Sequence, residues 1–255
     1  LEPRLAHRGP DDAGREVIDV EGEGRALGLS HRRLAIIDLT SAGHQPMRDS
    51  ATGNWIAFNG EIYNFRALRE RLEGAGHSFV SESDTEVILK AYDEWGVDCL
   101  GELRGMFALA LWDQRAQRLL LAVDRLGIKP LYYYRGDDGL LLFSSEVRAL
   151  LETERVPRRI DPAGLESYLA FGSVQAPGTV VRGMRCLRPG HYAFADARGK
   201  MTGPVRYWAP AFAGAEAGAG RADDLYASLE EAVRLHLVGD VPVGIFLSGG
   251  IDSSC

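Results

Sequence analysis

The end of the chain most constrains its fold, because an apolar β-branched run leads there into a turn of glycines and hydroxyls. Residues 241–247 predict a buried strand, and Ser-Gly-Gly-Ile-Asp-Ser-Ser follows over residues 248–254. Adjacent glycines let backbone amides approach an anion closely, and serine hydroxyls add donors. The pattern therefore indicates a phosphate or pyrophosphate loop, with an ordinary glycine-rich turn as the alternative. No lysine follows the glycines, which excludes the G-x-x-x-x-G-K-[ST] loop.

The residues before this loop predict the opening of a doubly wound α/β domain. Over residues 223–238, apolar side chains recur at every fourth position, which predicts a helix with a core-facing stripe: Leu225, Leu229, Val233 and Leu237. Residues 211–220 are mostly Ala, Gly and Glu, as in a flexible linker. We therefore expect a first domain over residues 1–208, a linker over 209–221 and the beginning of a second domain over 222–255.

The first domain is expected to be of the α+β class. Strands are expected over residues 26–32, 34–37, 54–58, 105–113, 118–124, 131–134 and 140–144, and helices over 65–74, 145–152 and 161–171. The two apolar runs at 105–113 and 118–124 are separated by a short polar turn, which predicts a hairpin in the core. The pair at 131–134 and 140–144 predicts a second hairpin.

Composition narrows the class of partner. A hydrophobic fraction of 45% and a charged fraction of 25% are ordinary for a globular protein, and a net charge of −7 argues against a nucleic-acid surface. No apolar stretch approaches the ~20 residues that span a bilayer. The cysteines Cys99, Cys186 and Cys255 are few and far apart, which fits a reducing cytoplasm without a structural metal site. We expect a cytoplasmic protein with no nucleic-acid or membrane partner.

Four polar strings stand out in the first domain. They occupy residues 7–11 (His-Arg-Gly-Pro-Asp), 33–38 (Arg-Leu-Ala-Ile-Ile-Asp), 59–64 (Asn-Gly-Glu-Ile-Tyr-Asn) and 83–86 (Ser-Asp-Thr-Glu). Each has a purely structural interpretation: Arg33 in a surface ion pair, Asn59-Gly60 in a turn, and the string at 83–86 as a helix capping box.

Together, the strings describe a pocket for a small zwitterion. Arg33 can bind a carboxylate through two parallel hydrogen bonds, and Asp84, at a helix start, can pair with an ammonium group. The side-chain amide of Asn59 and the backbone N–H of Gly60 can converge on one oxyanion, while Glu61 adds an acceptor. A free amino acid with an amide side chain would use all of these groups.

In this order, the four strings resemble the glutaminase domain of class II glutamine amidotransferases. With the phosphate loop behind them, the chain resembles the glutamine-hydrolysing asparagine synthetase family, and the resemblance extends through residues 124–133, 144–150 and 188–191. The fold implied is the N-terminal-nucleophile hydrolase αββα sandwich, with two antiparallel sheets between helical layers. The start of a doubly wound α/β domain, of the adenine nucleotide α-hydrolase-like type, would follow it.

The resemblance also implies site residues. For glutamine these are Arg33 with the backbone up to Ile37 at the α-carboxylate, Asp84 and Glu61 at the α-amino group, and Asn59 and Gly60 as the oxyanion hole. In the second domain Leu247 would lie against the adenosine of ATP, Ser248, Gly249, Gly250 and Ser253 would hold pyrophosphate, and Asp252 would bind Mg²⁺. Residues 124–133 and Glu146 are expected to be scaffold.

One departure from the family concerns the nucleophile, which in the family is a cysteine at the mature N-terminus. Here the chain begins with Leu1, and none of Cys99, Cys186 and Cys255 is expected to replace that cysteine. We therefore expect a piece of a longer protein that, as given, does not hydrolyse glutamine.

The parent protein is expected to release ammonia from glutamine, to activate aspartate with MgATP as β-aspartyl-AMP and to form asparagine, with a homodimer as one possible assembly. Three alternatives stay open. The same machinery could amidate another carboxylate, such as a sugar acid. The protein could instead be a β-lactam-synthetase-like enzyme without glutaminase activity, or a non-catalytic glutamine-binding module.

Overall fold

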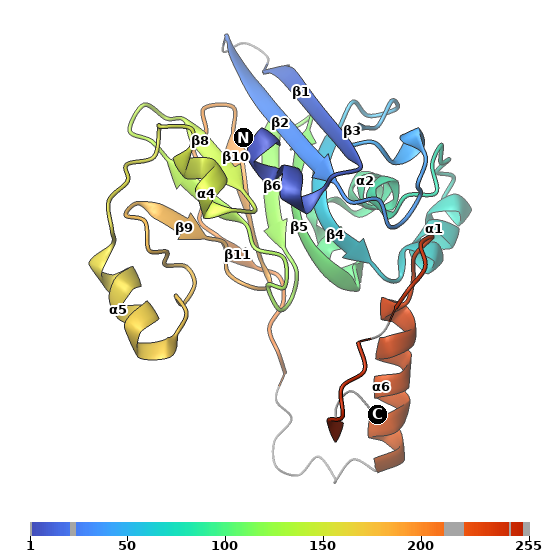
Figure 1. The fold of residues 1–255 in the computed structure, drawn as a ribbon. Helices are drawn as coiled ribbons and strands as arrows, with labels where there is room; N and C mark the ends of the chain where they lie inside the picture. Colours follow the sequence, from blue (N-terminus) through green and yellow to red (C-terminus); the bar gives the residue numbers. More distant parts are fainter. Residues whose placement is uncertain (1, 21–23, 212–221, 245, 252–255) are drawn as a thin grey trace.

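A six-stranded antiparallel sheet forms the centre of the computed structural model, which describes residues 2–20, 24–211, 222–244 and 246–251 (Figure 1). In spatial order its strands are β11 (Val205–Arg206), β10 (His191–Asp196), β6 (Arg118–Val123), β5 (Gly105–Asp113), β4 (Trp55–Ile62) and β3 (Met47–Arg48). The predicted core hairpin is confirmed, because β5 pairs with β6 from Ala108 opposite Val123 to Asp113 opposite Arg118.

The described residues also form helices. They are α1 (Phe65–Gly74), α2 (Asp84–Trp95), α3 (Cys99–Glu102), α4 (Val147–Leu151), α5 (Pro162–Phe171) and α6 (Ala222–His236), with the 3₁₀ turns η1 (Glu2–Arg8), η2 (Ser41–Gly43) and η3 (Gly96–Asp98). The predicted helices at 65–74, 145–152 and 161–171 are confirmed to within two residues at each end.

Strand β5 is buried on both faces, and its alternating side chains separate two apolar clusters. Leu109 and Leu111 belong to the cluster that includes the buried faces of α1 and α2. Ala108 and Ala110 belong to a second cluster, shared with β1 and β2. Since successive strand residues point to opposite faces, the sheet has helices on one side and a second layer of strands on the other.

The second layer consists of two small sheets. In one, β1 (Asp12–Val20) pairs with β2 (Arg25–Arg33); in the other the order is β8 (Leu141–Ser144), β7 (Tyr132–Arg135) and β9 (Met184–Cys186). The predicted hairpin of β7 with β8 is confirmed. Within the described residues, β2 and β8 are edge strands. Sheets and helices together give the mixed α+β class that the sequence predicts.

Two predicted strands are wrong. Residues 34–37 form a loop, because their backbone groups bond to the side chains of Arg33 and Asp11 and to the backbone of Asp240 rather than to a neighbouring strand. The described residues of 241–247 are not a strand either, and Phe246 and Leu247 are exposed. A single extended segment needs a neighbour to satisfy its backbone, and the described residues provide none there.

Helix α6 is confirmed as a helix, but its apolar stripe does not face a core. The stripe residues Leu225, Leu229 and Val233 are 64%, 54% and 59% exposed. In Figure 1, α6 extends away from the sheets, and its second half contacts the rest of the chain, as in an ion pair of 3.2 Å between Glu231 and Arg104. The interpretation of the stripe as core-facing is therefore wrong for the part of the chain that the structure describes.

Within the described residues, every helix is too short or too polar to cross a membrane.

Candidate functional site

A cavity of about 500 Å³ opens between the six-stranded sheet and the second layer. Its lining includes all six residues predicted for the glutamine site: Arg33, Ile37, Asn59, Gly60, Glu61 and Asp84. The edge strands β2 and β8 both border it, and three small side chains of the central sheet lie in its wall: Ala57, Ala108 and Ala110. Residues distant in sequence are thus brought together around one space.

Arg33, the last residue of β2, holds the loop that follows it. Its buried guanidinium donates hydrogen bonds to the carbonyls of Ile37 (2.9 Å), Asp38 (2.5 Å) and Thr40 (3.1 Å). The chain wraps around this side chain, which is the physical reason that residues 34–37 are not a strand. A guanidinium has five N–H groups, so two remain for a ligand.

Gly43 lies directly against the Arg33 guanidinium. A Cβ atom on Gly43 would fall 2.0 Å from Nη2 of Arg33, so no other residue fits without moving the arginine. Thr40 caps the short turn η2, in which its side chain accepts a hydrogen bond from the Ala42 N–H. No periodic pattern in the sequence indicates this contact, and Gly43 is not among the predicted site residues.

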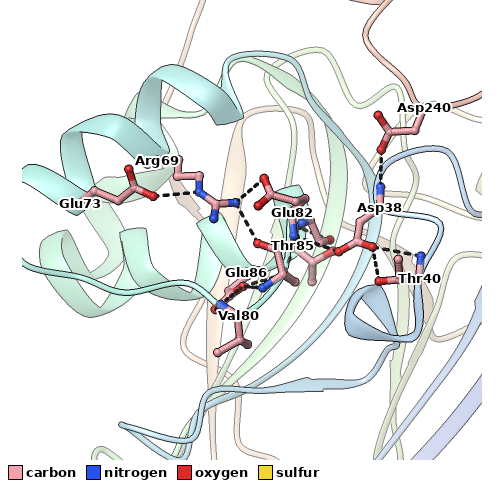
Figure 2. Close-up of polar contacts among 11 residues, drawn as sticks. Asp38, Thr40, Arg69, Glu73, Val80, Glu82, Thr85, Glu86 and Asp240 are labelled. Atoms are coloured by element: carbon pink, nitrogen blue, oxygen red, sulfur yellow. Dashed lines mark hydrogen bonds and ion pairs between the residues drawn. The ribbon is translucent and has the colours of Figure 1, made fainter.

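Asp38 connects this loop to the start of α2 (Figure 2). Its carboxylate accepts hydrogen bonds from the N–H and hydroxyl of Thr40 and from the N–H of Glu82, at 3.0, 2.5 and 2.9 Å. Its backbone is left-handed, with φ of 53°. Asp38 was within a predicted string, yet we did not assign it a role; an aspartate two residues before a threonine is a common local hydrogen-bonding pattern.

Asn59 and Gly60 lie within β4, so their interpretation as a turn is wrong. A Cβ on Gly60 would fall 2.0 Å from the Met106 carbonyl of β5, which requires glycine here. Phe107 of β5 lies opposite Gly60, but its backbone N–H and C=O bond to Asp124 instead of to Gly60. The two residues therefore form a non-hydrogen-bonded pair of the antiparallel ladder, in which the N–H and C=O of both residues point away from the partner strand. The Gly60 N–H therefore points to the free edge of β4.

Side chains occupy this free edge on both sides of Gly60. The N–H of Phe58 donates to the side chain of Gln45 at 2.7 Å, and the N–H of Ile62 donates to the Asp84 carboxylate at 3.0 Å. Gly60 lies between them and also lines the cavity. Its N–H is thus an oriented donor that remains available to a ligand in the cavity.

The start of α2 places Asp84 in the cavity wall. The Ser83 hydroxyl accepts a hydrogen bond from the Thr85 N–H at 3.2 Å, as an N-cap does. The predicted capping box is only half formed, because Glu86 accepts from the N–H groups of Val80 and Ser81 instead of Ser83 (Figure 2).

Two acidic side chains of the cavity have raised pKa values. Burial raises the pKa of Asp84 to about 6 although the Ile62 N–H favours its charged form, and the nearby charge of Glu61 adds to the rise. Burial also raises the pKa of Glu61, against the charges of Lys129 and His236. A cation bound beside both carboxylates would reverse this effect, so the pair is suited to an ammonium group.

His31 is a cavity residue that we did not predict. It lies two residues before Arg33 on β2, hence on the same face of the strand. Burial lowers its pKa to about 4, so the ring is neutral at pH 7, and it bonds to the backbone of Phe58. Its Nδ1 is buried without a hydrogen-bond partner in the described structure, which leaves one atom able to bond a ligand.

The described cysteines lie away from the cavity. Cys99 is buried at the start of α3, and burial raises its thiol pKa to about 12. Cys186 is half-buried in β9, and burial raises its pKa as well. Neither lines the cavity, and Cys255 lies outside the described residues. The described part of the chain therefore offers this cavity no thiolate.

Two predicted scaffold residues make structural contacts. Asp124 accepts hydrogen bonds from several backbone N–H groups: Phe107, Leu126, Ile128 and Lys129. Glu146 accepts one from the side chain of Arg8 at 2.6 Å and pairs with His7 at 2.9 Å. In the first predicted string, the carboxylate of Asp11 accepts from the Ala35 N–H at 2.9 Å. These contacts hold the segments around the cavity.

The predicted pyrophosphate loop is not part of this cavity. Leu247, Ser248, Gly249 and Gly250 are exposed, and the Gly250 N–H donates to the Ser248 hydroxyl at 3.4 Å. Asp252 and Ser253 lie outside the described residues. Among the residues that are described, no group of three or more His, Cys, Asp or Glu side chains is arranged to hold a metal ion.

Comparison with known proteins yields two family matches. A family model described as a glutamine amidotransferase domain matches residues 1–208, and one described as asparagine synthase matches residues 224–255. The asparagine synthetase [glutamine-hydrolyzing] 3 of Bacillus subtilis is 39% identical over 98% of this chain and 40% of its own length. Amidase chry2 of Gibberella zeae is 36% identical over 98% of this chain and 36% of its length. The chain thus spans about two-fifths of these curated relatives.

Among solved structures, a glutamine phosphoribosylpyrophosphate amidotransferase from B. subtilis has the same fold. The match has a TM-score of 0.56 at 21% identity, over 80% of this chain and 44% of the other. The N-terminal-nucleophile type of amidotransferase fold is therefore confirmed for the first domain. The doubly wound α/β part is barely represented in the described residues.

Proposed function

This chain belongs to the class II glutamine amidotransferases and continues into a segment of the asparagine synthase family, and we propose that its cavity binds glutamine as the nitrogen source for asparagine synthesis. The observation that carries the proposal is the meeting of three separate strings on one cavity. Arg33, Asn59 and Asp84 come from the end of β2, from β4 and from the start of α2.

Each group of a bound glutamine has a matching residue. An N–H group of Arg33 that the loop carbonyls leave unused, on Nε or Nη1, would bind the α-carboxylate beside Ile37. Asp84 and Glu61 would bind the α-amino group, which restores their ionised forms. The side-chain amide of Asn59 and the outward N–H of Gly60 would bind the amide oxygen and hold its charge in the tetrahedral intermediate.

The reaction also needs a nucleophile, and the two free strand edges indicate where it would come from. Strands β2 and β8 both border the cavity, opposite the small side chains of Ala57, Ala108 and Ala110. We infer that a further strand of the parent protein fills this gap and begins with the cysteine of the family. Its thiolate would add to the amide carbon, its α-amino group would carry the proton to the departing ammonia, and water would hydrolyse the thioester.

For the remainder, we propose a glutaminase domain over residues 1–208, a linker over 209–221 and the beginning of a synthetase domain over 222–255. The exposed hydroxyl of Ser248 and the amides of Gly249 and Gly250 are neutral donors of the kind that phosphate oxygens accept from. With Leu247, Ser253 and Asp252, they would hold ATP and its Mg²⁺, which activate the acceptor carboxylate.

Aspartate is the acceptor that we propose, in a cytoplasmic enzyme whose dispersed thiols stay reduced. Similarity to amidase chry2 favours a second candidate, in which the same machinery amidates a different carboxylate. The two differ only in the acceptor; the glutamine site is common to both.

Calorimetric titration of this chain with L-glutamine tests the site. We expect binding by the wild type, a loss of at least about tenfold in affinity for Arg33→Ala and Asp84→Ala, and no change for the control Arg155→Ala, whose ion pair with Asp138 is exposed. Thermal melting of each variant shows that it is folded. The proposal fails if the wild type does not bind glutamine, or if Arg33→Ala binds it equally well.

A further inference from the structure

We propose that Asp240, from the segment after α6, is a positioning residue of the glutamine site; this inference rests on the proposed function. Asp240 lies outside the residues that line the cavity, and it belongs to the part of the chain that leads to the phosphate loop. Its effect on glutamine would pass through the loop that surrounds Arg33.

Asp240 holds the backbone of that loop at two points. Its carboxylate accepts a hydrogen bond of 2.8 Å from the N–H of Asp38 (Figure 2), and its own N–H donates one of 2.8 Å to the carbonyl of Ile36. The two bonds flank Ile37, which lines the cavity. The segment after α6 therefore fixes the two residues on either side of Ile37.

From the other side, the same loop is held by Arg33. The guanidinium donates to the carbonyls of Ile37 and Asp38. The loop thus lies between a cationic donor and an anionic acceptor, and hydrogen bonds to charged groups are the stronger ones. Asp38 also has a left-handed backbone, which persists only where its surroundings hold it. Without Asp240, one of these supports is lost.

The residues around Asp240 fit closely against the first domain. Val238 and Ile36 both pack against the apolar cluster that includes Ile37. A Cβ on Gly239 would fall 3.1 Å from Cγ2 of Ile36, closer than most Cβ contacts. The ring of His236 lies 4.3 Å from that of Tyr63, at the end of β4. Asp240 is therefore at the end of a docked segment, not on a free tail.

This geometry predicts that loss of the Asp240 carboxylate lowers glutamine affinity and does not only lower the stability of the fold. If the Asp240 carboxylate is removed, the Asp38 N–H loses its acceptor and the loop can shift. The carbonyls that orient the Arg33 guanidinium then shift with it, so its unused N–H group no longer points at the glutamine carboxylate. A contact that only held α6 to the domain would leave glutamine affinity unchanged.

The test is calorimetric titration of the chain with L-glutamine for Asp240→Ala, Asp240→Asn and the matched control Glu231→Ala. Glu231 makes another contact between α6 and the domain, the exposed ion pair with Arg104. We expect affinity about tenfold weaker for Asp240→Ala, and within about twofold of the wild type for Asp240→Asn, whose amide oxygen can still accept from Asp38. Glu231→Ala should bind like the wild type.

One further measurement and one further variant distinguish a local change in the loop from a general loss of structure. Amide hydrogen exchange should become faster at Asp38 in Asp240→Ala, but not in Asp240→Asn or in the core strand β5. If Asp240→Ala does not fold, Gly239→Ala provides a second variant, because its methyl group would push Ile36 while the carboxylate remains. We expect it, too, to weaken glutamine binding.

The outcomes separate this inference from the proposed function. The inference is overturned if Asp240→Ala and Gly239→Ala bind glutamine like the wild type while Arg33→Ala does not, and the proposed function then stands. It is also overturned if Glu231→Ala weakens binding as much as Asp240→Ala does. If the wild type does not bind glutamine, both fail together.

Discussion

The carboxylate of Asp84 accepts a hydrogen bond of 3.0 Å from the backbone N–H of Ile62, which joins the first residue of α2 to the last residue of β4. Ile62 is two residues after Gly60 on β4, so this bond holds the buried carboxylate of Asp84 near the Gly60 N–H. A helix N-terminus favours the ionised form of an acid, yet burial dominates here and raises the pKa of Asp84 to about 6. The free protein therefore holds an acid that lacks a counter-charge.

The first prediction is that Asp84→Asn stabilises the ligand-free chain. The pKa of Asp84 is about 6 in the folded state against an ordinary 3.8, so ionisation at pH 7.5 costs stability, by up to about 3 kcal/mol. Asparagine keeps an acceptor for the Ile62 N–H and carries no charge. We expect the melting temperature to rise by about 2–6 °C in scanning calorimetry, with glutamine binding lost. Asp93→Asn, exposed on the same helix, is the control; a lower melting temperature for Asp84→Asn would contradict the prediction.

The second prediction concerns the pH dependence of glutamine binding. An ammonium group binds the ionised form of Asp84, whose pKa in the free protein is about 6. Above that pH the acid is already ionised, and below it a proton must leave before glutamine binds. Affinity should be constant from pH 7 to 8 and fall at least about tenfold per unit well below pH 6. Titrations between pH 5 and pH 8 check this; a flat profile would show that Asp84 does not contact the ligand.

The third prediction is that Gly43→Ala impairs the site without touching the cavity. The added methyl group would lie 2.0 Å from Nη2 of Arg33, so the guanidinium must move. We expect glutamine affinity to fall about as far as in Arg33→Ala, by tenfold or more. Gly28→Ala on β2 is the matched control, because nothing lies within 4 Å of its added atom. Equal binding by both glycine variants would mean that the position of Arg33 does not matter.

The fourth prediction concerns stability away from the site. Lys90 on α2 and Asp49 form a buried ion pair, with Nζ 2.9 Å from Oδ1 and exposed side-chain fractions of 11% and 2%. Replacing one partner leaves a buried charge uncompensated. Lys90→Met should lower the free energy of unfolding by about 3–5 kcal/mol in urea titrations. Arg71→Met, which breaks the exposed pair with Glu102, should cost under about 1 kcal/mol; similar losses for both would refute the distinction.

Local patterns allowed much of the fold to be predicted from the sequence. The apolar runs of β5 and β6 are separated by a short polar turn, and the structure pairs them as expected. The run Leu-Ala-Ile-Ile at 34–37 looks the same by composition, yet it forms a loop. The difference lies in Arg33 and Asp240, which bond to its backbone, and apolar periodicity carries no signal for such side-chain contacts.

The same limit applies to the candidate site: residues in compact local strings could be predicted, and contacts between distant residues could not. Arg33, Asn59 and Asp84 lie in compact polar strings, so their residue types alone suggested a zwitterion pocket, and the structure brings them to one cavity. Asp38 and Asp240 are 202 positions apart and meet only in the folded chain. Their pairing depends on where α6 docks, which no local pattern determines.

A crystal structure of this chain with L-glutamine bound would show directly whether the cavity is the glutamine site. The described residues around the cavity include no cysteine, so the ligand should remain intact. We expect its carboxylate to lie at Arg33, its amino group at Asp84 and its amide oxygen at the N–H of Gly60. An empty cavity at saturating glutamine, or a ligand with its amino group at Arg33, would show that this cavity is not the glutamine site.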